Sequence, residues 1–402
     1  MSAPLRILHV TPTYIPAWRY GGPIRSVHGL CAGLARRGHD VHVFTTNVDG
    51  PGDSGVPLGA PVALDGVAVW YFPSTRARRL YWSPPMADAL RAQLPRFDLA
   101  HLHSLFNWPP DVTARMCRKV GVPYLVAPRG MLVRELVERK STLLKRAWLA
   151  LTGKQMLEQA AGIHATSSLE IEDAEKFGYR LPSFHMVPNG VEYGEYEGSN
   201  DALNPDVQTL SAGAPYILFM GRISWKKGLD RLLHAMALID GVNLIIAGND
   251  EEGHRSELEA LAASLGIRTR IVYTGEVHGE RKRELLHNAR LLVLPSYSEN
   301  FGIVVLEAMA VGRPVVVTPE VGIASLVGEC GAGVVAEGEP ERLATALAWL
   351  LDNPKEADRM GSLGRKTVGE RFTWDAVAKQ MENVYAAILS LHGIKDPAGS
   401  NR

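Results

Sequence analysis

Short apolar segments alternate with amphipathic helical segments along nearly the whole chain, and this alternation limits the folds available to it. The first apolar segment, "RILHVTP", is followed by a glycine-containing loop, the helical segment "VHGLCAGLARRG" and a second apolar segment, "DVHVFTT". This order predicts a βαβ unit, in which a helix connects two parallel strands. The strands are almost continuously apolar, which is typical of a parallel sheet with helices on both faces.

Similar strands are predicted in both halves of the chain. In the first half they are "VAVWYFP", "LAHLHS", "PYLVAP", "GIHATS" and "FHMVPNGV"; in the second they are "PYILFMG", "VNLIIAG", "RIVYTG", "RLLVLPS", "RPVVVTP" and "GAGVVA". Between the halves lies "EYGEYEGSNDALNPDVQTLSAGAP", a polar stretch without periodicity that we interpret as a linker. The sequence thus predicts two doubly wound α/β domains that face a central cleft, because ligands bind beyond the carboxyl ends of such strands.

The predicted domain boundaries follow from these segments. They are an N-terminal domain at 1–195, a linker at 196–214, a second domain at 215–372 and a C-terminal helix at 373–392.

Composition excludes several classes of protein. The 402 residues are 46% apolar and carry 43 basic and 43 acidic side chains, so no field of one sign favours nucleic acid as a partner. Cys31, Cys117 and Cys330 are far apart, which argues against a zinc site or a disulfide framework. The N-terminal "MSAPLRILHVTPTY" lacks the apolar core of a signal peptide, and no apolar run reaches the roughly 18 residues of a membrane span, so we expect a cytoplasmic protein.

Two carboxylates mark the segment "SENFGIVVLEAMAVGRPVVV". Glu299 lies in the loop after the strand "RLLVLPS", and Glu307 lies in the helix that follows. The amides near Phe301 and Gly302 start that helix, and such amides form a natural anion site. We therefore interpret the segment as a nucleotide-sugar site, with ribose on Glu307, diphosphate on the turn and sugar hydroxyls on Glu299. The alternative is a loop glutamate and a helix glutamate paired with a nearby lysine.

Two further loops favour a ligand. "GRISWKKGLD" follows the strand "PYILFM", and its Arg222 and Lys227 could neutralise a diphosphate. We interpret the neighbouring Lys226 as a solvated side chain. In "YGGPIRS", Gly21 and Gly22 leave space for a ligand to approach the backbone, although this is not the GxGxxG pattern of nicotinamide-binding proteins.

Together these segments resemble the retaining glycosyltransferases of family four. "SENFGIVVLEAMAVGRPV" resembles their E-x7-E motif, "GRISWKKGLD" their phosphate loop, "YGGPIRSV" their N-terminal glycine loop and "PNGV" their domain junction. The resemblance runs from about residue 5 to residue 391. It implies the GT-B fold, with the donor on the second domain, the acceptor on the first, and the last helix crossing back onto the first domain.

The resemblance also implies roles for individual residues. Arg222 and Lys227 would hold the diphosphate, Glu307 the ribose and Glu299 the transferred sugar. The remaining donor-site residues it implies are Asn300, Phe301, Gly302 and Ile303 for sugar and phosphate, Gly21 and Gly22 for the phosphates, and Gly248 and Val277 for the nucleobase.

One position departs from the family pattern. Many members have a histidine after the strand that here reads "PYLVAP", where this chain has Arg129 and Gly130. His103 could contact the substrate instead, and we expect His101, on the same strand face, to lie in the core. Arg129 could bind the donor or an anionic acceptor. The pair "HLH" alone is a weak metal motif.

The function implied is a metal-independent, hexosyltransferase-type retaining enzyme without a cofactor. It would transfer a sugar from a UDP- or GDP-sugar to a glycan, a lipid-linked acceptor or a small molecule. A non-hydrolysing nucleotide-sugar epimerase and an inactive nucleotide-sugar-binding protein remain alternatives. The basic segment at 129–157 could lie on an anionic membrane, at the inner face of the cell membrane, or form ordinary solvent-facing helices.

Overall fold

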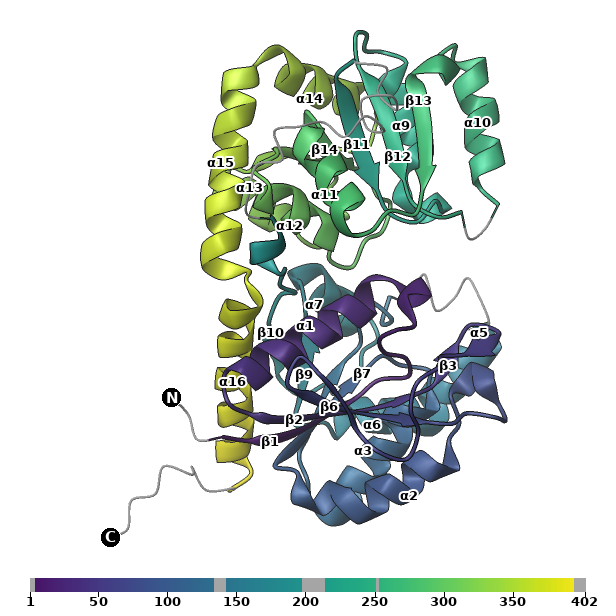
Figure 1. Cartoon of the computed structure of the whole chain (residues 1–402), viewed down its shortest axis with the longest axis vertical. Helices are drawn as coiled ribbons and strands as arrows, with labels where there is room; N and C mark the ends of the chain where they lie inside the picture. Colours follow the sequence, from purple (N-terminus) through teal and green to yellow (C-terminus); the bar gives the residue numbers. More distant parts are fainter. Residues whose placement is uncertain (1–3, 134–141, 197–213, 251–252, 394–402) are drawn as a thin grey trace. The chain divides into compact units, whose positions relative to one another are not determined.

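The computed structural model describes residues 4–133, 142–196, 214–250 and 253–393 (Figure 1). The chain divides into two compact units. Unit 1 contains Met1–Gly190 and Trp374–Arg402, and unit 2 contains Val191–Thr373. Unit 2 begins five residues before the predicted linker, at Val191, whose amide donates a hydrogen bond to the Phe372 carbonyl, at 2.8 Å. Most of the predicted linker, 196–214, lies outside the described residues.

Unit 1 contains an eight-stranded sheet in the order β10-β9-β8-β7-β1-β2-β6-β5. Its strands are β1 (Arg6–Val10), β2 (Asp40–Thr46), β5 (Val62–Leu64), β6 (Val67–Phe72), β7 (Leu99–His103), β8 (Tyr124–Ala127), β9 (Gly162–Ala165) and β10 (Phe184–Met186). All neighbours pair in parallel except β5, which runs antiparallel to β6 at one edge. The strand order reverses between β1 and β7, so a ligand site is expected beyond the carboxyl ends of these two strands.

Helices cover both faces of this sheet. They are α1 (Gly22–Arg36), α2 (Pro84–Gln93), α3 (Trp108–Val120), α5 (Thr142–Trp148), α6 (Lys154–Glu158), α7 (Ser168–Glu175) and α16 (Trp374–Leu391). Since side chains alternate along a strand, Ile7 packs with α1 and α16 on one face, whereas Leu8 packs with α2 and α3 on the other. Each face therefore has its own apolar core.

The C-terminal helix α16 packs on α1 in unit 1. Gly29 and Gly33 leave room for it, because a Cβ at Gly29 would overlap the Trp374 indole and one at Gly33 would lie 2.7 Å from the Trp374 carbonyl oxygen. The Glu382 carboxylate accepts hydrogen bonds from the Arg37 guanidinium at 2.7 and 2.9 Å. Small residues on one helix and an ion pair beside them thus join elements at opposite ends of the chain.

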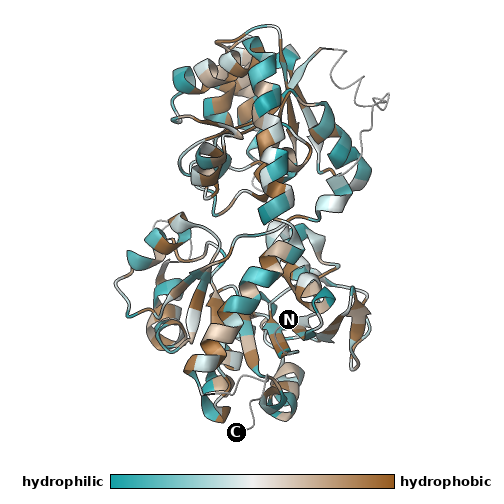
Figure 2. Ribbon diagram, turned by 90° about the vertical axis from the view of Figure 1, so that its left-hand side faces the viewer, coloured by the Kyte–Doolittle hydropathy of each residue, from teal (hydrophilic) through white to brown (hydrophobic). Residues whose placement is uncertain are grey.

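Unit 2 contains a six-stranded parallel sheet in the order β13-β12-β11-β14-β15-β16, the order of a doubly wound dinucleotide fold. Its strands are β11 (Tyr216–Met220), β12 (Asn243–Ala247), β13 (Ile271–Gly275), β14 (Leu291–Leu294), β15 (Val315–Val317) and β16 (Gly333–Val335). Its helices are α9 (Leu229–Met236), α10 (Arg255–Ser264), α11 (Gly279–Asn288), α12 (Ile303–Ala310), α13 (Ala324–Cys330), α14 (Pro340–Asp352) and α15 (Pro354–Arg371). In Figure 2 the strands are mainly hydrophobic, whereas the long helix α15 shows hydrophilic residues along much of its surface.

The strands expected from the apolar segments all form, but the pattern missed β5 and the hairpin of β3 (Val48–Asp49) with β4 (Gly52–Asp53). These strands have only two or three residues, so they are too short to form a distinct apolar run in the sequence. The three cysteines are free thiols. Within the described residues, no helix combines the length and apolar character needed to cross a membrane.

Candidate active site

The switch point of unit 2 lies between β11 and β14, which are neighbours in the sheet. The loops that leave the carboxyl ends of these two strands contain the predicted basic loop and the predicted Glu299 loop. Hydrogen bonds join them, because the Lys226 carbonyl accepts from the Tyr297 amide at 2.7 Å and from the Ser298 amide at 3.4 Å. The fold therefore brings together two segments that are about 70 positions apart.

A glycine makes this close approach possible. Gly228 follows the 3-10 turn η6 (Trp225–Lys227) with φ 62°, a left-handed conformation that favours glycine. A Cβ at Gly228 would overlap the Pro295 carbonyl oxygen. Any other residue would move the basic loop away from the Glu299 loop.

Lys227 and Glu299 form an ion pair across the two loops. Their side chains are 16% and 20% exposed. Burial raises the pKa of the Glu299 carboxyl, but the charge and hydrogen bond of Lys227, a hydrogen bond from the Phe301 amide and the charge of Arg222 together lower this pKa below its ordinary value. Glu299 is therefore ionised at neutral pH, and all three charged residues named from the sequence lie within one electrostatic neighbourhood.

The backbone of the Glu299 loop is fixed on both sides. The Glu299 amide donates to the Glu320 carbonyl at 3.1 Å, and the Gly322 amide donates to the Glu299 carbonyl at 2.9 Å. Gly302, with φ 91°, then caps α12 without a side-chain hydrogen bond to the cap within the described chain. The first amides of a helix have no intrahelical partner, so this turn presents donors to an anion beside Lys227.

Glu307 lies one turn into α12 and is 7% exposed at its side chain. Lys282 of α11 donates to its carboxylate at 2.5 Å. The alternative interpretation of the sequence, a helix glutamate paired with a nearby lysine, is therefore confirmed for Glu307, although it did not name Lys282. The segment "RKRELLHNA" begins with three consecutive basic residues, and no signal in it distinguishes the one that reaches Glu307.

The remaining predicted donor residues lie at strand ends or in the core. Gly248 follows β12, and a Cβ there would overlap the Gly221 carbonyl oxygen, so close packing of backbones requires this glycine. Val277 is 8% exposed and belongs to the core of unit 2. Gly21 and Gly22 begin α1 in unit 1, and open space surrounds the position of a Cβ at either residue.

The two unit 1 residues singled out for catalysis contact each other. His103 ends β7 and is completely buried, and Arg129 follows β8 and is half-buried. The Arg129 guanidinium donates to Nδ1 of His103 at 3.4 Å and to Oδ1 of Asn189 at 2.8 Å. Because His103 is 0% exposed, its imidazole contacts protein groups in this structure, Arg129 among them.

His101 lies in the core, as the sequence predicted, and is also 0% exposed. The basic segment 129–157 is only partly described, since Arg134, Arg139 and Lys140 lie outside the described residues. In its described part, Leu143 of α5 and Leu151 are 84% and 78% exposed.

Comparison with known proteins agrees with this architecture. The structure of sucrose-phosphate synthase from Thermosynechococcus elongatus has a TM-score of 0.77 with this one at 22% identity, and the match covers 96% of this chain and 100% of that chain. The structure of HepE from Anabaena in complex with UDP and glucose has a TM-score of 0.75 at 19% identity, covering 95% and 100%. The two parallel-sheet units define the GT-B glycosyltransferase fold.

The sequence comparisons assign the family. Residues 21–190 match the glycosyl transferase 4-like domain, and residues 202–367 match glycosyl transferases group 1. A D-inositol 3-phosphate glycosyltransferase from Xylanimonas cellulosilytica is 31% identical over 399 residues, which cover 91% of each chain. This chain belongs to the GT4-type glycosyltransferases.

Proposed function

We propose that this glycosyltransferase moves a hexose from a UDP- or GDP-linked donor to an acceptor hydroxyl and retains the anomeric configuration. The observation that carries the proposal is the Lys227–Glu299 ion pair, placed with Arg222 at the switch point of unit 2 and beside the N-terminus of α12. The alternative of a nucleotide-sugar epimerase is disfavoured by the family assignment.

The ion pair suits a ligand that carries both charge and hydroxyl groups. A diphosphate entering the site would take over Lys227, with Arg222 and the α12 amides as further donors. The Glu299 carboxylate would then be free to accept hydrogen bonds from the sugar hydroxyls. Glu307, held by Lys282, would accept hydrogen bonds from the ribose in the same way.

The reaction needs stabilisation of charge more than a protein nucleophile. The bond between the anomeric carbon and the β-phosphate oxygen breaks, and the acceptor oxygen bonds to the anomeric carbon on the same face. The acceptor proton passes to the departing phosphate oxygen. Arg222, Lys227 and the helix amides stabilise the negative charge that develops on the phosphate, and positioning of the reactants supplies much of the rate.

Protein cations take the place of a metal ion in this scheme, so we propose that the enzyme works without one. Activity should then survive removal of divalent cations by EDTA. A requirement for Mg²⁺ or Mn²⁺ would contradict this part of the proposal.

Solved structures of the same fold support the choice of donor. HepE is described in complex with UDP and glucose, which supports a UDP-sugar as the first candidate. A thermal-shift panel of UDP-, GDP- and ADP-sugars will identify the base, because a ligand that binds only the folded state raises Tm. The acceptor would be a glycan, a lipid-linked glycan or a small molecule, and the cationic Arg129 supports one that carries a phosphate.

Substitution tests the assignment. Arg222→Ala, Lys227→Ala and Glu299→Ala should each retain the fold and lower sugar transfer by about 100- to 1,000-fold, the usual effect of removing one charge-stabilising group. Lys226→Ala is the matched control, because this residue joins the two loops through its backbone carbonyl. Wild-type transfer by Arg222→Ala or Glu299→Ala would refute the proposal.

A further inference from the structure

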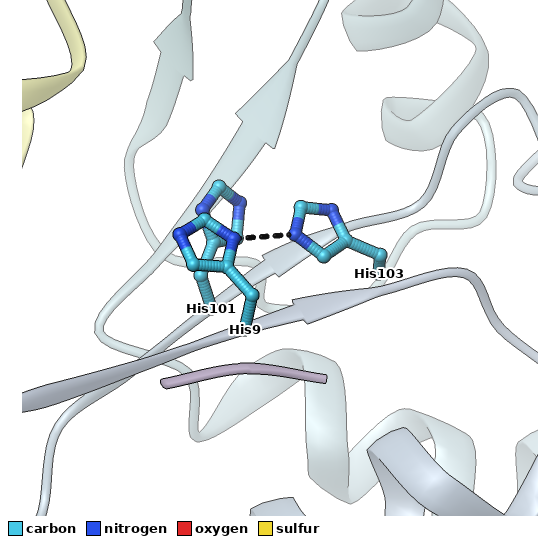
Figure 3. A group of neighbouring side chains, drawn as sticks. All are labelled: His9, His101 and His103. Atoms are coloured by element: carbon cyan, nitrogen blue, oxygen red, sulfur yellow. Dashed lines mark hydrogen bonds between the residues drawn. The ribbon is translucent and has the colours of Figure 1, made fainter. Parts of the chain in front are cut away.

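Four buried histidines lie on one face of the unit 1 sheet, at its switch point. They are His9 of β1, His101 and His103 of β7, and His164 of β9, and none is more than 2% exposed. Figure 3 shows the imidazoles of His9, His101 and His103 gathered together, with a hydrogen bond between His9 and His103. Their ligand atoms lie within 4.8 Å of one another, a spacing that could hold a metal ion.

The hydrogen bonds of His101 and His164 determine which ring nitrogen of each imidazole carries the proton. Nε2 of His164 lies 2.8 Å from the Val187 carbonyl oxygen, so this nitrogen carries a proton and Nδ1 is an acceptor. Nε2 of His101 therefore donates to Nδ1 of His164, at 3.2 Å. Nδ1 of His101 in turn accepts from the Tyr385 hydroxyl of α16, at 2.8 Å.

A second series of hydrogen bonds runs from Arg129 through His103 to His9. A guanidinium can only donate, so Nδ1 of His103 accepts from Arg129, at 3.4 Å. Nε2 of His103 then carries a proton and donates to Nδ1 of His9, at 3.0 Å. The remaining proton lies on Nε2 of His9, which has no hydrogen-bond partner among the described residues.

This accounting disfavours a metal ion. Both nitrogens of His103 are already used, one by Arg129 and one by His9. A cation on the three imidazoles would have to break the His9–His103 bond and lie near a guanidinium of the same sign. Two hydrogen-bonded chains of neutral imidazoles satisfy the geometry without either cost.

Within the described residues no carboxylate accepts a hydrogen bond from Arg129, although the nearby charge of Glu170 raises the pKa of its guanidinium against the lowering effect of burial. Asn189 and His103 are neutral acceptors, and Nε of Arg129 is buried without a partner in the described part of the chain. The nearby carboxylate, Glu170, accepts from the Gly130 amide at 2.6 Å and from Thr166 at 2.8 and 2.9 Å. Lys227 in unit 2, by contrast, is paired with a carboxylate.

The backbone supports a binding role for this residue. Arg129 has φ 56°, a left-handed conformation that is uncommon for a residue with a side chain and that concentrates at ligand sites. It follows β8 at the carboxyl edge of the sheet, where ligands of such folds bind. A cation whose hydrogen-bond acceptors are neutral can still attract an anion.

We propose that His103, itself held by His9, is a positioning residue that orients Arg129 to bind a phosphate group of a substrate. The inference rests on the proposed function, since it names the ligand group that unit 1 would recognise. His103 acts through Arg129 and needs no contact with the substrate.

The test uses inorganic pyrophosphate as the probe and the whole chain labelled with ¹⁵N-arginine. The Arg129 Nε–H signal, assigned by its loss in Arg129→Lys, should shift in a saturable way as pyrophosphate is added. In His103→Leu the apparent Kd should rise at least fivefold. His103→Gln should stay within about twofold of wild type, because its amide can accept from Arg129 and donate to His9.

Several outcomes would overturn the inference. They are an Arg129 signal that pyrophosphate does not move, a His103→Leu variant of wild-type Kd, and stoichiometric Zn²⁺ retained after purification and lost in His9→Leu. Thermal unfolding of each variant will show whether the folded state is retained, and the titration of the wild-type Arg129 signal still tests the inference if His103→Leu fails to fold.

The same titration separates this inference from the proposed donor site. Arg222→Ala removes an anion ligand of unit 2 and should leave the titration of the Arg129 signal unchanged. If the wild type transfers sugar and Arg129 does not bind the probe, only the positioning inference fails. If the probe binds and no nucleotide-sugar is used, only the proposed function fails.

Discussion

Mild acid should unfold unit 1, because its four buried histidines cannot take up a proton without losing a hydrogen-bond acceptor. Burial, with a smaller effect of the Arg129 charge, lowers the pKa of both His9 and His164 from 6.5 to about 3. Burial and the neighbouring charges also lower the pKa of His101 and His103. His9 and His164 are therefore neutral in the folded protein at pH 5, and burial favours the neutral form of His101 and His103 in the same way.

The direction of the effect follows from proton linkage. In the unfolded chain each imidazole has a pKa near 6.5 and takes up a proton as the pH falls below it. In the folded state His9 and His164 do not take up that proton until about pH 3. Stability is thus fully present above pH 6.5 and is lost as the pH falls through the window between the two pKa values.

The expected loss of unfolding free energy is large for a domain. Between pH 7 and pH 5, one histidine that stays neutral when folded costs about 2 kcal/mol of unfolding free energy. His9 and His164 together should cost about 4 kcal/mol, against a typical total of about 5–15 kcal/mol, and His101 and His103 change the stability in the same direction. Carboxyl groups of the unfolded chain titrate mainly below pH 5, so they contribute little in this window.

Denaturant unfolding followed by tryptophan fluorescence will measure this loss. Unit 1 contains six of the eight tryptophans, namely Trp18, Trp70, Trp82, Trp108, Trp148 and Trp374. His164→Gln should reduce the pH dependence by about one proton, or about 1.4 kcal/mol per pH unit, because glutamine can keep both hydrogen bonds. The exposed His234→Gln is the matched control. An unfolding free energy of unit 1 that is equal at pH 7 and pH 5 would refute the reasoning.

Three further predictions concern other parts of the chain. Gly228→Ala should destabilise unit 2 by about 2–3 kcal/mol in denaturant unfolding, because the new methyl group would overlap the Pro295 carbonyl oxygen and the backbone would be strained. Gly241→Ala is the control: its φ is similar but the space around it is open, so it should cost only about 1 kcal/mol. Lys282→Met leaves the buried Glu307 carboxylate unpaired and should cost about 3 kcal/mol by the same measurement; a second change, Glu307→Gln, should restore most of it, and no restoration would argue against the pair. The exposed Leu143 and Leu151, beside basic residues, should direct the chain to vesicles containing anionic lipid, and equal co-sedimentation with zwitterionic vesicles would contradict this.

Local sequence patterns were enough to predict the class of fold and the grouping of Arg222, Lys227 and Glu299 in unit 2. Apolar runs located the parallel strands, because a strand that is buried on both faces has apolar side chains at consecutive positions. Arg222, Lys227 and Glu299 could be named because each lies directly after a predicted strand, where ligands of doubly wound sheets bind.

Tertiary structure alone decided which side chains meet. Lys282 and Glu307 pair because α11 packs beside α12, whereas the sequence alone offers three consecutive basic residues in that segment. The histidine chains depend on the order β9-β8-β7-β1 and on α16 returning to unit 1, which brings Tyr385 within 2.8 Å of His101. Periodicity reports which face of its own element a residue occupies, whereas contacts across strands and between distant helices depend on how those elements are ordered in the sheet.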